Sequence, residues 1–247
     1  MVRSLHELRI NLTAGEAQTL VVLQPGYLPW LGFFDQLIRS DIFVFYDDVQ
    51  FDKNGWRNRN RIKSPGGPQW LTVPVRVHSL SQLILETEID NRQPWARKHT
   101  TTIKQLYAKA PYIKRYLPEL EDLLSGRRWD LLVDLDLALI KLIATWLGIE
   151  RRMVRASELN IKGDRSQRLL NICRKFNARQ YVSGDAAQGY LDVERFEQEG
   201  VEVQWQSYQH PIYPQQHGSF VPFLSTIDLL LNCGDESAAI ISNGRAS

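Results

Sequence analysis

The sequence predicts an α/β fold with a mainly parallel sheet, built from two strand–helix blocks with a helical insert between them. Short apolar runs alternate with amphipathic helical segments after residue 18 and again after residue 151. Between the two blocks, residues of about 93–148 keep a helical spacing. An α+β fold, in which residues 69–90 form an antiparallel hairpin, is the alternative.

The first block begins with TLVVL at residues 19–23, a short β-branched run typical of a buried strand. The loop QPGYLPW follows, because its prolines and glycine exclude a helix or a central strand. The elements expected next are a short amphipathic helix at 31–40, a buried strand at 41–48, and further strands at 69–75 and 83–90.

The insert is predicted to hold three helices, at 93–109, 112–124 and 129–147, and Pro94, Pro111 and Pro118 lie near the starts or first turns of the first two. The second block is predicted as a strand at 152–156, a helix at 166–176, a strand at 180–184, a helix at 190–200, a strand at 201–206 and a final helix at 222–232. We expect a single domain over residues 19–235, after an N-terminal extension at 1–18 and before a tail at 236–247.

Composition limits the partners that this chain can have. Its net charge is only +2, which argues against general nucleic-acid binding and requires any anion site to be local. Residues 1–18 contain no continuous apolar segment typical of a secretory signal. The longest apolar stretch, 131–147, is interrupted by Asp134, Asp136 and Lys141, so we predict no membrane span. A cytoplasmic protein is expected, and its oligomeric state is left open.

Polar and aromatic residues follow four of the predicted strands. In a parallel sheet the carboxyl ends of the strands share one edge, and ligands bind outside that edge. The sequence therefore predicts a site at this rim. The residues concerned are Gln24 at the end of the first strand, Asp47 and Asp48 at the end of the second, Ser183 and Gly184 at the end of the strand at 180–184, and Tyr208, His210, Tyr213 and Gln215 after the strand at 201–206.

The segment 47–63 is rich in charge. Arg57, Arg59, Arg61 and Lys63 occupy every second position, with Asn58 and Asn60 between them, so an extended conformation would place the four cations on one face. Arginine suits bidentate recognition of phosphate and carboxylate. The alternative is a solvated edge strand, which charge protects from pairing. Trp56 and the asparagines favour the first interpretation, with a phosphate-bearing small molecule or an acidic carrier protein as the partner.

His210 is the best candidate for a general base, because its ordinary pKa lies near neutrality and it precedes a proline in an irregular loop. Asp47 and Asp48 are adjacent, so in a strand their side chains point to opposite faces and at most one is catalytic. Asp48 is preferred, although capping a turn or neutralising arginines is the alternative for both. The sequence contains no GxGxxG, GxxxxGK[ST], GxSxG, HExxH or CxxC motif. No cofactor is expected, and a metal requirement is left open.

The segment from VLQPGYLPWLGFFDQLIRSDIFVFYDDVQFDKNGWRNRNRIK through WLTVPV resembles the opening of the WbqC-like protein family. The resemblance continues in YVSG, YLD, HPIYPQ and LSTIDLLLN, so that it covers residues of about 20–235 in order. The family's pattern marks, in this chain, Gln24, Tyr27, Pro29, Trp30, Asp48, Gln50, Trp56, Arg57, Asn58, Arg59, Asn60, Ser183, Gly184, His210, Tyr213 and Gln215.

This resemblance implies a place in surface-polysaccharide, O-antigen or natural-product assembly. The leading hypothesis is a transferase that moves an activated acyl or aminoacyl unit onto an amino acceptor such as an amino-sugar nucleotide. In it, the cations bind phosphate, His210 removes the acceptor proton, and Asn58 or Asn60 positions the reacting carbonyl. A nucleotidyltransferase-like enzyme and a non-catalytic scaffold of a polysaccharide assembly complex are the alternatives.

Overall fold

Five short strands form a central sheet in the order β7-β2-β1-β8-β9, and every neighbouring pair is parallel. The structure is a computed structural model that describes residues 18–53 and 55–245. The parallel sheet confirms the predicted α/β fold. Its strands are β1 (Thr19–Leu23), β2 (Ile42–Phe45), β7 (Arg152–Arg155), β8 (Gln180–Ser183) and β9 (Glu202–Trp205).

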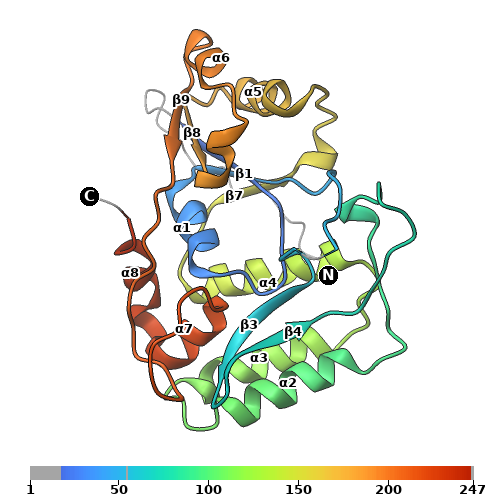
Figure 1. Cartoon of the computed structure of the whole chain (residues 1–247), viewed down its shortest axis with the longest axis vertical. Coiled ribbons are helices and arrows are strands. Elements are labelled where there is room, and N and C mark those ends of the chain that lie inside the picture. The colour runs from blue at the N-terminus through green and yellow to red at the C-terminus, as the bar shows by residue number, and fades with distance from the viewer. Residues whose placement is uncertain (1–17, 54, 246–247) are drawn as a thin grey trace, which may run out of the picture.

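The two faces of the sheet are covered by different helices, because successive strand residues point to opposite sides. Val21 and Phe43 on one face pack in a cluster with α1 (Leu31–Arg39) and α4 (Leu132–Trp146). Leu20 and Val44 on the other face pack with α5 (Arg165–Lys175) and α6 (Val193–Gln198). Figure 1 shows α5 and α6 above the sheet and α1 and α4 below it.

The strand order contains a topological switch point. From β1 the chain adds β2 and then β7 on one side, and it later adds β8 and β9 on the other side. The order therefore reverses between β1 and β8. In open parallel sheets, ligands bind in the crevice outside the carboxyl ends of the strands at such a point. The chain segments that follow Leu23 and Ser183 border this crevice.

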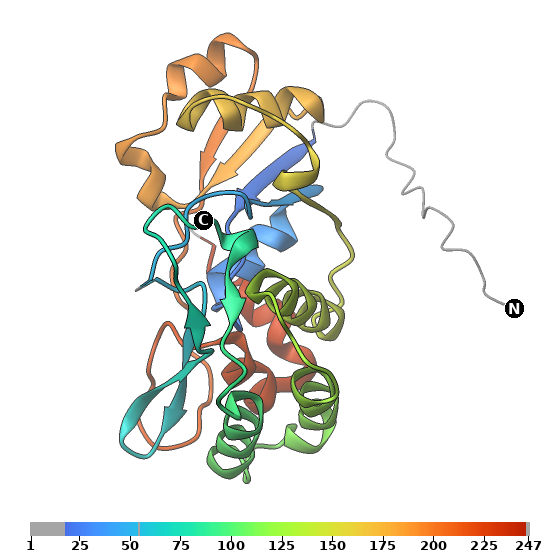
Figure 2. The same ribbon diagram turned by 90° about the vertical axis from the view of Figure 1, so that its right-hand side faces the viewer.

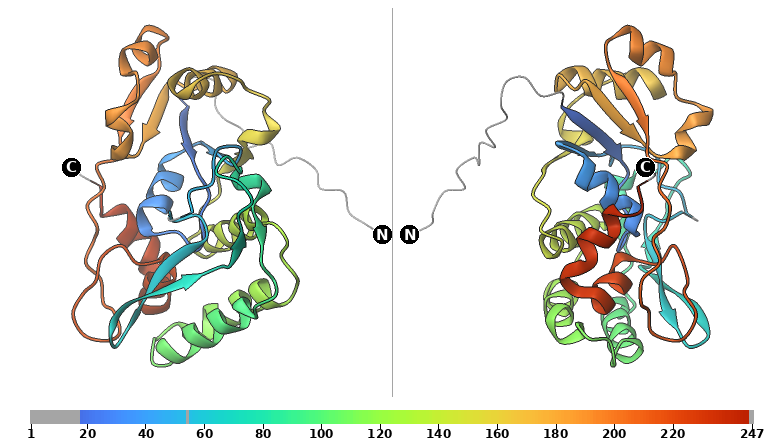
Figure 3. Two further views of the ribbon diagram at one scale, coloured as in Figure 1. Left: turned by 45° about the vertical axis from the view of Figure 1, so that its right-hand side comes forward. Right: turned by 90° about the vertical axis from the view of Figure 1, so that its left-hand side faces the viewer.

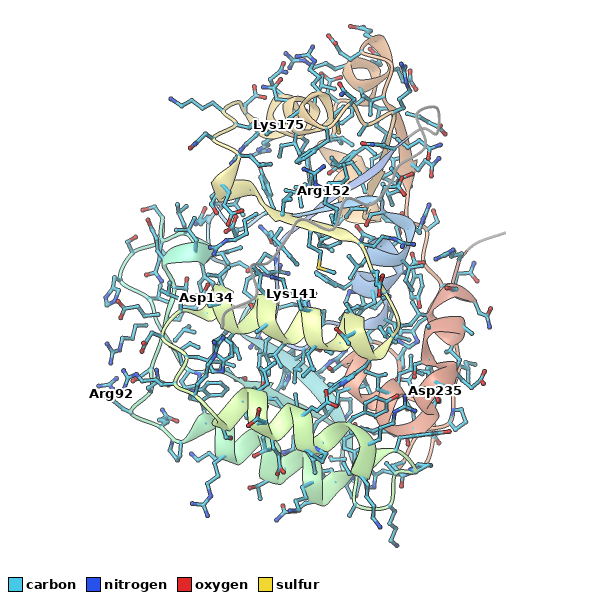
Figure 4. The ribbon with its side chains drawn as sticks, turned by 180° about the vertical axis from the view of Figure 1, so that it is seen from behind. Arg92, Asp134, Lys141, Arg152, Lys175 and Asp235 are labelled. Carbon is cyan, nitrogen blue, oxygen red and sulfur yellow. The ribbon has the colours of Figure 1, made fainter. Side chains whose placement is uncertain are left out.

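Three helices lie below the sheet in the residues where an insert was expected. They are α2 (Trp95–Leu106), α3 (Ile113–Ser125) and α4. Figure 4 shows α4 crossing the back of the molecule between the sheet and the other two helices. Lys141 on this helix is exposed. Asp136, on the same helix, is fully buried. Within the described residues, no helix is long and apolar enough to cross a membrane.

An antiparallel hairpin runs along one side of these helices, as Figures 1 and 2 show. It consists of β3 (Arg59–Ser64) and β4 (Gly67–Thr72), joined by a turn at Pro65 and Gly66. The prediction of a strand at 83–90 is mostly wrong. Only β6 (Glu88–Ile89) is a strand there, paired with β5 (Val75–Arg76), and η1 (Ile84–Glu86) precedes it. The Glu86 carboxylate accepts from the Leu83 N–H at 3.1 Å, a local bond that competes with a strand ladder.

The C-terminal residues pack against α1, on the face of the sheet that α1 covers. The expected final helix begins later than predicted, because the Ser225 hydroxyl accepts from the Ile227 N–H and caps it. Residues 236–245 form more than the expected tail: Ile241 is fully buried, and Arg245 Nε donates to Asp35 Oδ1 at 2.8 Å. Figure 3 shows these C-terminal helices beside α1. The remaining elements are α7 (Thr226–Cys233), η4 (Gly234–Glu236), α8 (Ser237–Ser242), η2 (Ala156–Glu158) and η3 (Asp185–Gly189).

The expected N-terminal extension at 1–18 lies, apart from Gln18, outside the described residues.

Candidate functional site

A pocket of about 410 Å³ opens at the carboxyl end of β1. It lies between the loop that follows β1, the start of α1, the strand β3 and the loop that precedes α7. A larger hollow of about 660 Å³ lies between α3 and α4, and none of its lining residues comes from the loops at the carboxyl ends of the sheet strands. The pocket is lined by Leu23, Gln24, Gly26, Pro29, Trp30, Phe33, Gln36, Trp56, Arg57, Asn60, Arg61 and Phe223.

The lining combines positive charge with aromatic rings. Arg57 and Arg61 are its charged residues, and no carboxylate belongs to the described lining. Trp30, Trp56 and Phe223 supply flat apolar surface. Arginines pair with phosphate and carboxylate, whereas aromatic rings stack on planar or sugar-like groups. The pocket therefore suits an anionic ligand that carries an apolar or ring-shaped part.

Arg57 lines the pocket and also binds the loop that follows β1. Its Nη1 donates to the carbonyl oxygens of Gln24 and Pro25, each at 2.9 Å. Its Nε lies 3.6 Å from Asp52 Oδ1. Burial lowers the pKa of Arg57, while Asp52 and Asp136 oppose that shift. The guanidinium thus holds the exit of β1 in place, and an anion would meet a partly desolvated cation.

Asn58, Asn60 and Lys63 bind backbone carbonyls on neighbouring segments. Asn58 Nδ2 donates to Val73 O at 2.8 Å, and Asn60 Nδ2 donates to Leu28 O at 2.7 Å. Lys63 is almost completely buried, and its Nζ donates to the carbonyl oxygens of Gly218 and Ser219. These side chains hold two loops onto the hairpin. Leu28 has a left-handed backbone conformation, with φ at 44°, so its loop needs such support.

Two glycines allow the close packing at the pocket. A Cβ at Gly26 would lie 2.7 Å from the carbonyl oxygen of Trp56. The loop after β1 can therefore pack this closely against the backbone that precedes β3 only because residue 26 has no side chain. A Cβ at Gly32 would lie 2.3 Å from two ring atoms of Trp30. The Trp30 ring therefore lies over the first turn of α1, which has no side-chain cap. These two contacts explain why glycine occupies both positions 26 and 32 in QPGYLPWLG.

His210 sits in an aromatic cluster behind the pocket wall. Its ring stacks with Trp30 at 6.4 Å between centroids and lies edge-on to Phe223 at 5.3 Å, and both of these residues line the pocket. Its Nδ1 lies 2.9 Å from the carbonyl oxygen of Pro211, which can only accept, so the proton is on Nδ1. Burial lowers the pKa of His210, and Nε2 is buried without a hydrogen-bond partner among the described residues. The ring is thus a neutral base with a free lone pair.

Tyr27 and Tyr213 belong to buried hydrogen-bond networks, and Gln215 is half-buried. The Tyr27 hydroxyl lies 2.8 Å from His99 Nδ1. Tyr213 donates to Asp228 Oδ2 at 2.9 Å, and the other oxygen of this carboxylate accepts from Tyr107. Gln215 bonds the backbone of Val221 through both ends of its amide. These three predicted site residues shape the loops around the pocket, and none of them lines it.

The strand expected at 41–48 ends at Phe45, so Asp47 and Asp48 lie in the loop after β2 and not in the strand. The two aspartates pair with different arginines, and neither lines the pocket. Asp47 is buried and accepts from Arg155 Nε at 2.7 Å and from Ser157. Asp48 pairs with Arg168 on α5. The carboxylates at the end of β2 are therefore neutralised by arginines, and the choice of Asp48 as a catalytic residue stays a prediction.

The remaining predicted site residues border the pocket or lie away from it. Gly184, next to Ser183 at the end of β8, is close to Gln36, because a Cβ there would lie 3.7 Å from Gln36 Nε2. Gln50 is exposed and donates to Leu80 O at 2.6 Å, in a different loop. Arg59 lies on the outer face of the hairpin, with its guanidinium 4.6 Å from the centroid of the Trp70 ring.

The pocket includes residues that were not predicted as site residues. Arg61 was expected to bind an anion only as one of the alternating cations, and the individual site residues did not include it. Gln36 and Phe223 carry no comparable signal, because only the folded chain brings α1 and the loop before α7 to β3. Across the described residues, no group of three or more His, Cys, Asp or Glu side chains could hold a metal ion.

Comparison with known proteins identifies the class of this chain. The model of the WbqC-like protein family matches residues 24–240, so the chain belongs to the WbqC-like family. It is similar to the protein named "Uncharacterized protein Rv1507c" of Mycobacterium tuberculosis (strain ATCC 25618 / H37Rv). The two are 36% identical over 220 residues, which cover 88% of this chain and 95% of that protein. No solved structure matches the chain.

Proposed function

We propose that this protein is a biosynthetic transferase of surface-polysaccharide or natural-product assembly. It moves an activated acyl or aminoacyl unit onto an amino acceptor, such as an amino-sugar nucleotide. The observation that carries the proposal is the pocket at the carboxyl end of β1, which combines two arginines with aromatic rings and has a neutral histidine behind its wall. A phosphate-bearing substrate matches this charge, and the switch point of the sheet is where such ligands bind.

Each reacting group has a candidate partner in this arrangement. The lone pair of the acceptor amine attacks the carbonyl carbon of the activated unit, and a C–N bond forms. The bond from that carbon to its leaving group breaks, and the leaving group keeps the electron pair. The amine proton passes to Nε2 of His210, because Nδ1 already carries a proton that it donates to Pro211. The Asn60 amide, which donates to Leu28, orients the loop rather than the reacting carbonyl.

Phe223 separates His210 from the pocket in this proposal. Its backbone has a φ of 58°, a strained conformation for a bulky residue, and 47% of its surface is exposed. Its ring touches His210 on one side and lines the pocket on the other. We expect this ring to move when substrate binds, so that Nε2 meets the acceptor amine.

The test is a search for product by mass spectrometry, with an amino-sugar nucleotide as acceptor and a panel of acyl and aminoacyl donors. The variant His210→Phe keeps a ring in the aromatic cluster and removes the base. We expect it to lower kcat by about 100-fold or more with little change in KM. The control is His78→Ala, at an exposed histidine in the loop after β5. Absence of product with every donor, or full activity of His210→Phe, would contradict the proposal.

Nucleotidyl transfer is the second candidate function, and the strand order favours it. The order β7-β2-β1-β8-β9 corresponds to 3-2-1-4-5 in chain order, the arrangement of sheets that bind nucleotides at the first strand–helix turn. Incubation with ATP and candidate acceptors tests it, since this reaction releases pyrophosphate. A scaffold role, the third hypothesis, requires that Arg57→Ala and His210→Phe leave product formation in cells intact. The cytoplasmic location stays a prediction of the sequence.

A further inference from the structure

Two tryptophans and two arginines form an exposed surface on the outer side of the β3–β4 hairpin. We call Trp56, Trp70, Arg59 and Arg61 the tryptophan platform. Of the seven tryptophans in the chain, these two are the exposed ones, each with 43% of its surface accessible. Exposed tryptophan is costly to keep in water, so an adjacent pair on one face indicates a binding surface.

The geometry of the platform is defined by contacts between its own members. The rings of Trp56 and Trp70 are 5.2 Å apart between centroids. The guanidinium of Arg61 lies 5.4 Å from the Trp56 ring and 5.6 Å from the Trp70 ring. The cross-strand pairing of Arg61 with Trp70 places both side chains on the same face of the hairpin. The rings are therefore held in place before any ligand arrives.

The platform continues into the pocket. Trp56 and Arg61 belong to both, because they line the pocket and also contact Trp70, which lies outside it. Arg61 Nε is buried and has no hydrogen-bond partner within the described part of the chain. Its Nη2 makes a 3.3 Å bond to the carbonyl oxygen of Phe223 at the pocket rim. An extended ligand can thus lie across the platform and enter the pocket past Arg61.

We propose that the tryptophan platform binds the base of a nucleoside diphosphate whose diphosphate lies against Arg61 and whose remaining part enters the pocket. Bases stack on tryptophan rings, and arginines bind the phosphates that accompany them. This inference rests on the proposed function, because it assigns a binding surface to the nucleoside part of the proposed substrate, which lies outside the pocket.

A nucleotide fits this surface better than a free sugar or an acidic protein. A free sugar would need acceptors for its hydroxyl groups, and the four platform side chains provide donors and rings only. An acidic carrier protein would need cations spread over a wide surface. Here the guanidinium of Arg61 lies within 6 Å of the centroids of both rings. The platform is therefore about the size of one base and its phosphates.

The test compares the affinities of five nucleoside diphosphates (ADP, CDP, GDP, UDP and TDP) with that of pyrophosphate by titration calorimetry. Pyrophosphate lacks the base, so the difference in affinity isolates stacking. We expect at least one nucleotide to bind 10- to 100-fold more tightly than pyrophosphate. Trp70→Ala should abolish that advantage and leave pyrophosphate affinity unchanged, while Trp70→Phe should restore most of it. Tyr190→Ala, at an exposed tyrosine outside the platform, is the control.

Equal affinities for all nucleotides and pyrophosphate, or a nucleotide preference that survives Trp70→Ala, would overturn the proposal. Binding of an acidic carrier protein that depends on Trp70, without nucleotide binding, would overturn it in favour of a protein partner. The transferase proposal is tested separately: if nucleotides require Trp70 but no product forms, the platform stands and the proposed reaction fails.

Discussion

The buried and the exposed parts of the hairpin segment carry similar side chains that make different contacts. Asn60 and Lys63 are buried and donate to backbone carbonyls of loops that pack on the hairpin. Arg61, two residues before Lys63 in β3 and on the same strand face, lies against Trp56 and Trp70, which are exposed. Similar residues therefore differ by burial: the buried ones hold loops in place, and those at the surface present charge and aromatic rings. A run of cations in a sequence does not show by itself which of them face a ligand.

Lys63→Met should have the largest effect on stability. It leaves two carbonyl oxygens, of Gly218 and Ser219, without the charged donor that satisfies them. We expect the free energy of unfolding to fall by about 3 to 4 kcal/mol, measured by denaturant titration. Arg61→Met, at the less buried cation, should cost less than about 1 kcal/mol. Equal losses for the two variants would contradict the distinction between the buried and the surface cation.

His99, which is buried and lies beside the Tyr27 hydroxyl, should make stability depend on pH. Burial lowers its pKa to about 4 from 6.5, so the folded protein favours the neutral ring. Between pH 6.5 and 4 the unfolded chain binds the proton more readily, and stability must fall as the pH falls. This shift corresponds to about 3 kcal/mol over that window. In His99→Gln that part of the pH dependence should disappear from unfolding curves, and an unchanged pH profile would refute the assignment.

Asp136, on α4, is fully buried and should cost stability at neutral pH. Neither of its oxygens has a hydrogen-bond partner in the described chain, and burial raises its pKa well above the ordinary value. A raised pKa means that the stability of the folded state is greatest below pH 3.8 and declines as the pH rises through the folded pKa.

Asp136→Asn should therefore stabilise the protein by about 2 kcal/mol at pH 8 and have little effect at pH 3.5. Chemical unfolding at the two pH values measures the difference. Destabilisation at pH 8 would mean that the carboxylate of Asp136 is required beside Arg57, as part of the charge balance of the site.

The sequence predicted the parallel fold and the edge at which the pocket opens, because both follow from local patterns. Apolar runs identified β1 and β2, and the residues after β1 supplied Gln24 and Trp30, which line the pocket. Trp56, Arg57 and Asn60 were also predicted and lie there.

Other features depend on tertiary contacts that a single sequence does not encode locally. Lys63 and Arg61 are alike in the sequence, and only the loop over Lys63 buries one of them. Asp48 follows a strand as Gln24 does, yet Arg168 on α5 pairs with it. The sequence does not indicate that Trp70 lies beside Trp56, because the register of the β3–β4 hairpin determines which side chains are neighbours.

The most direct test is a crystal structure of the protein with a nucleotide-linked amino sugar. We expect the base to stack on Trp70, the diphosphate to contact Arg61, and the sugar to lie between Gln24 and Trp30. A ligand bound elsewhere, for example in the hollow between α3 and α4, or one that touches neither tryptophan of the platform, would contradict the assignment of the outer face as the substrate-binding side.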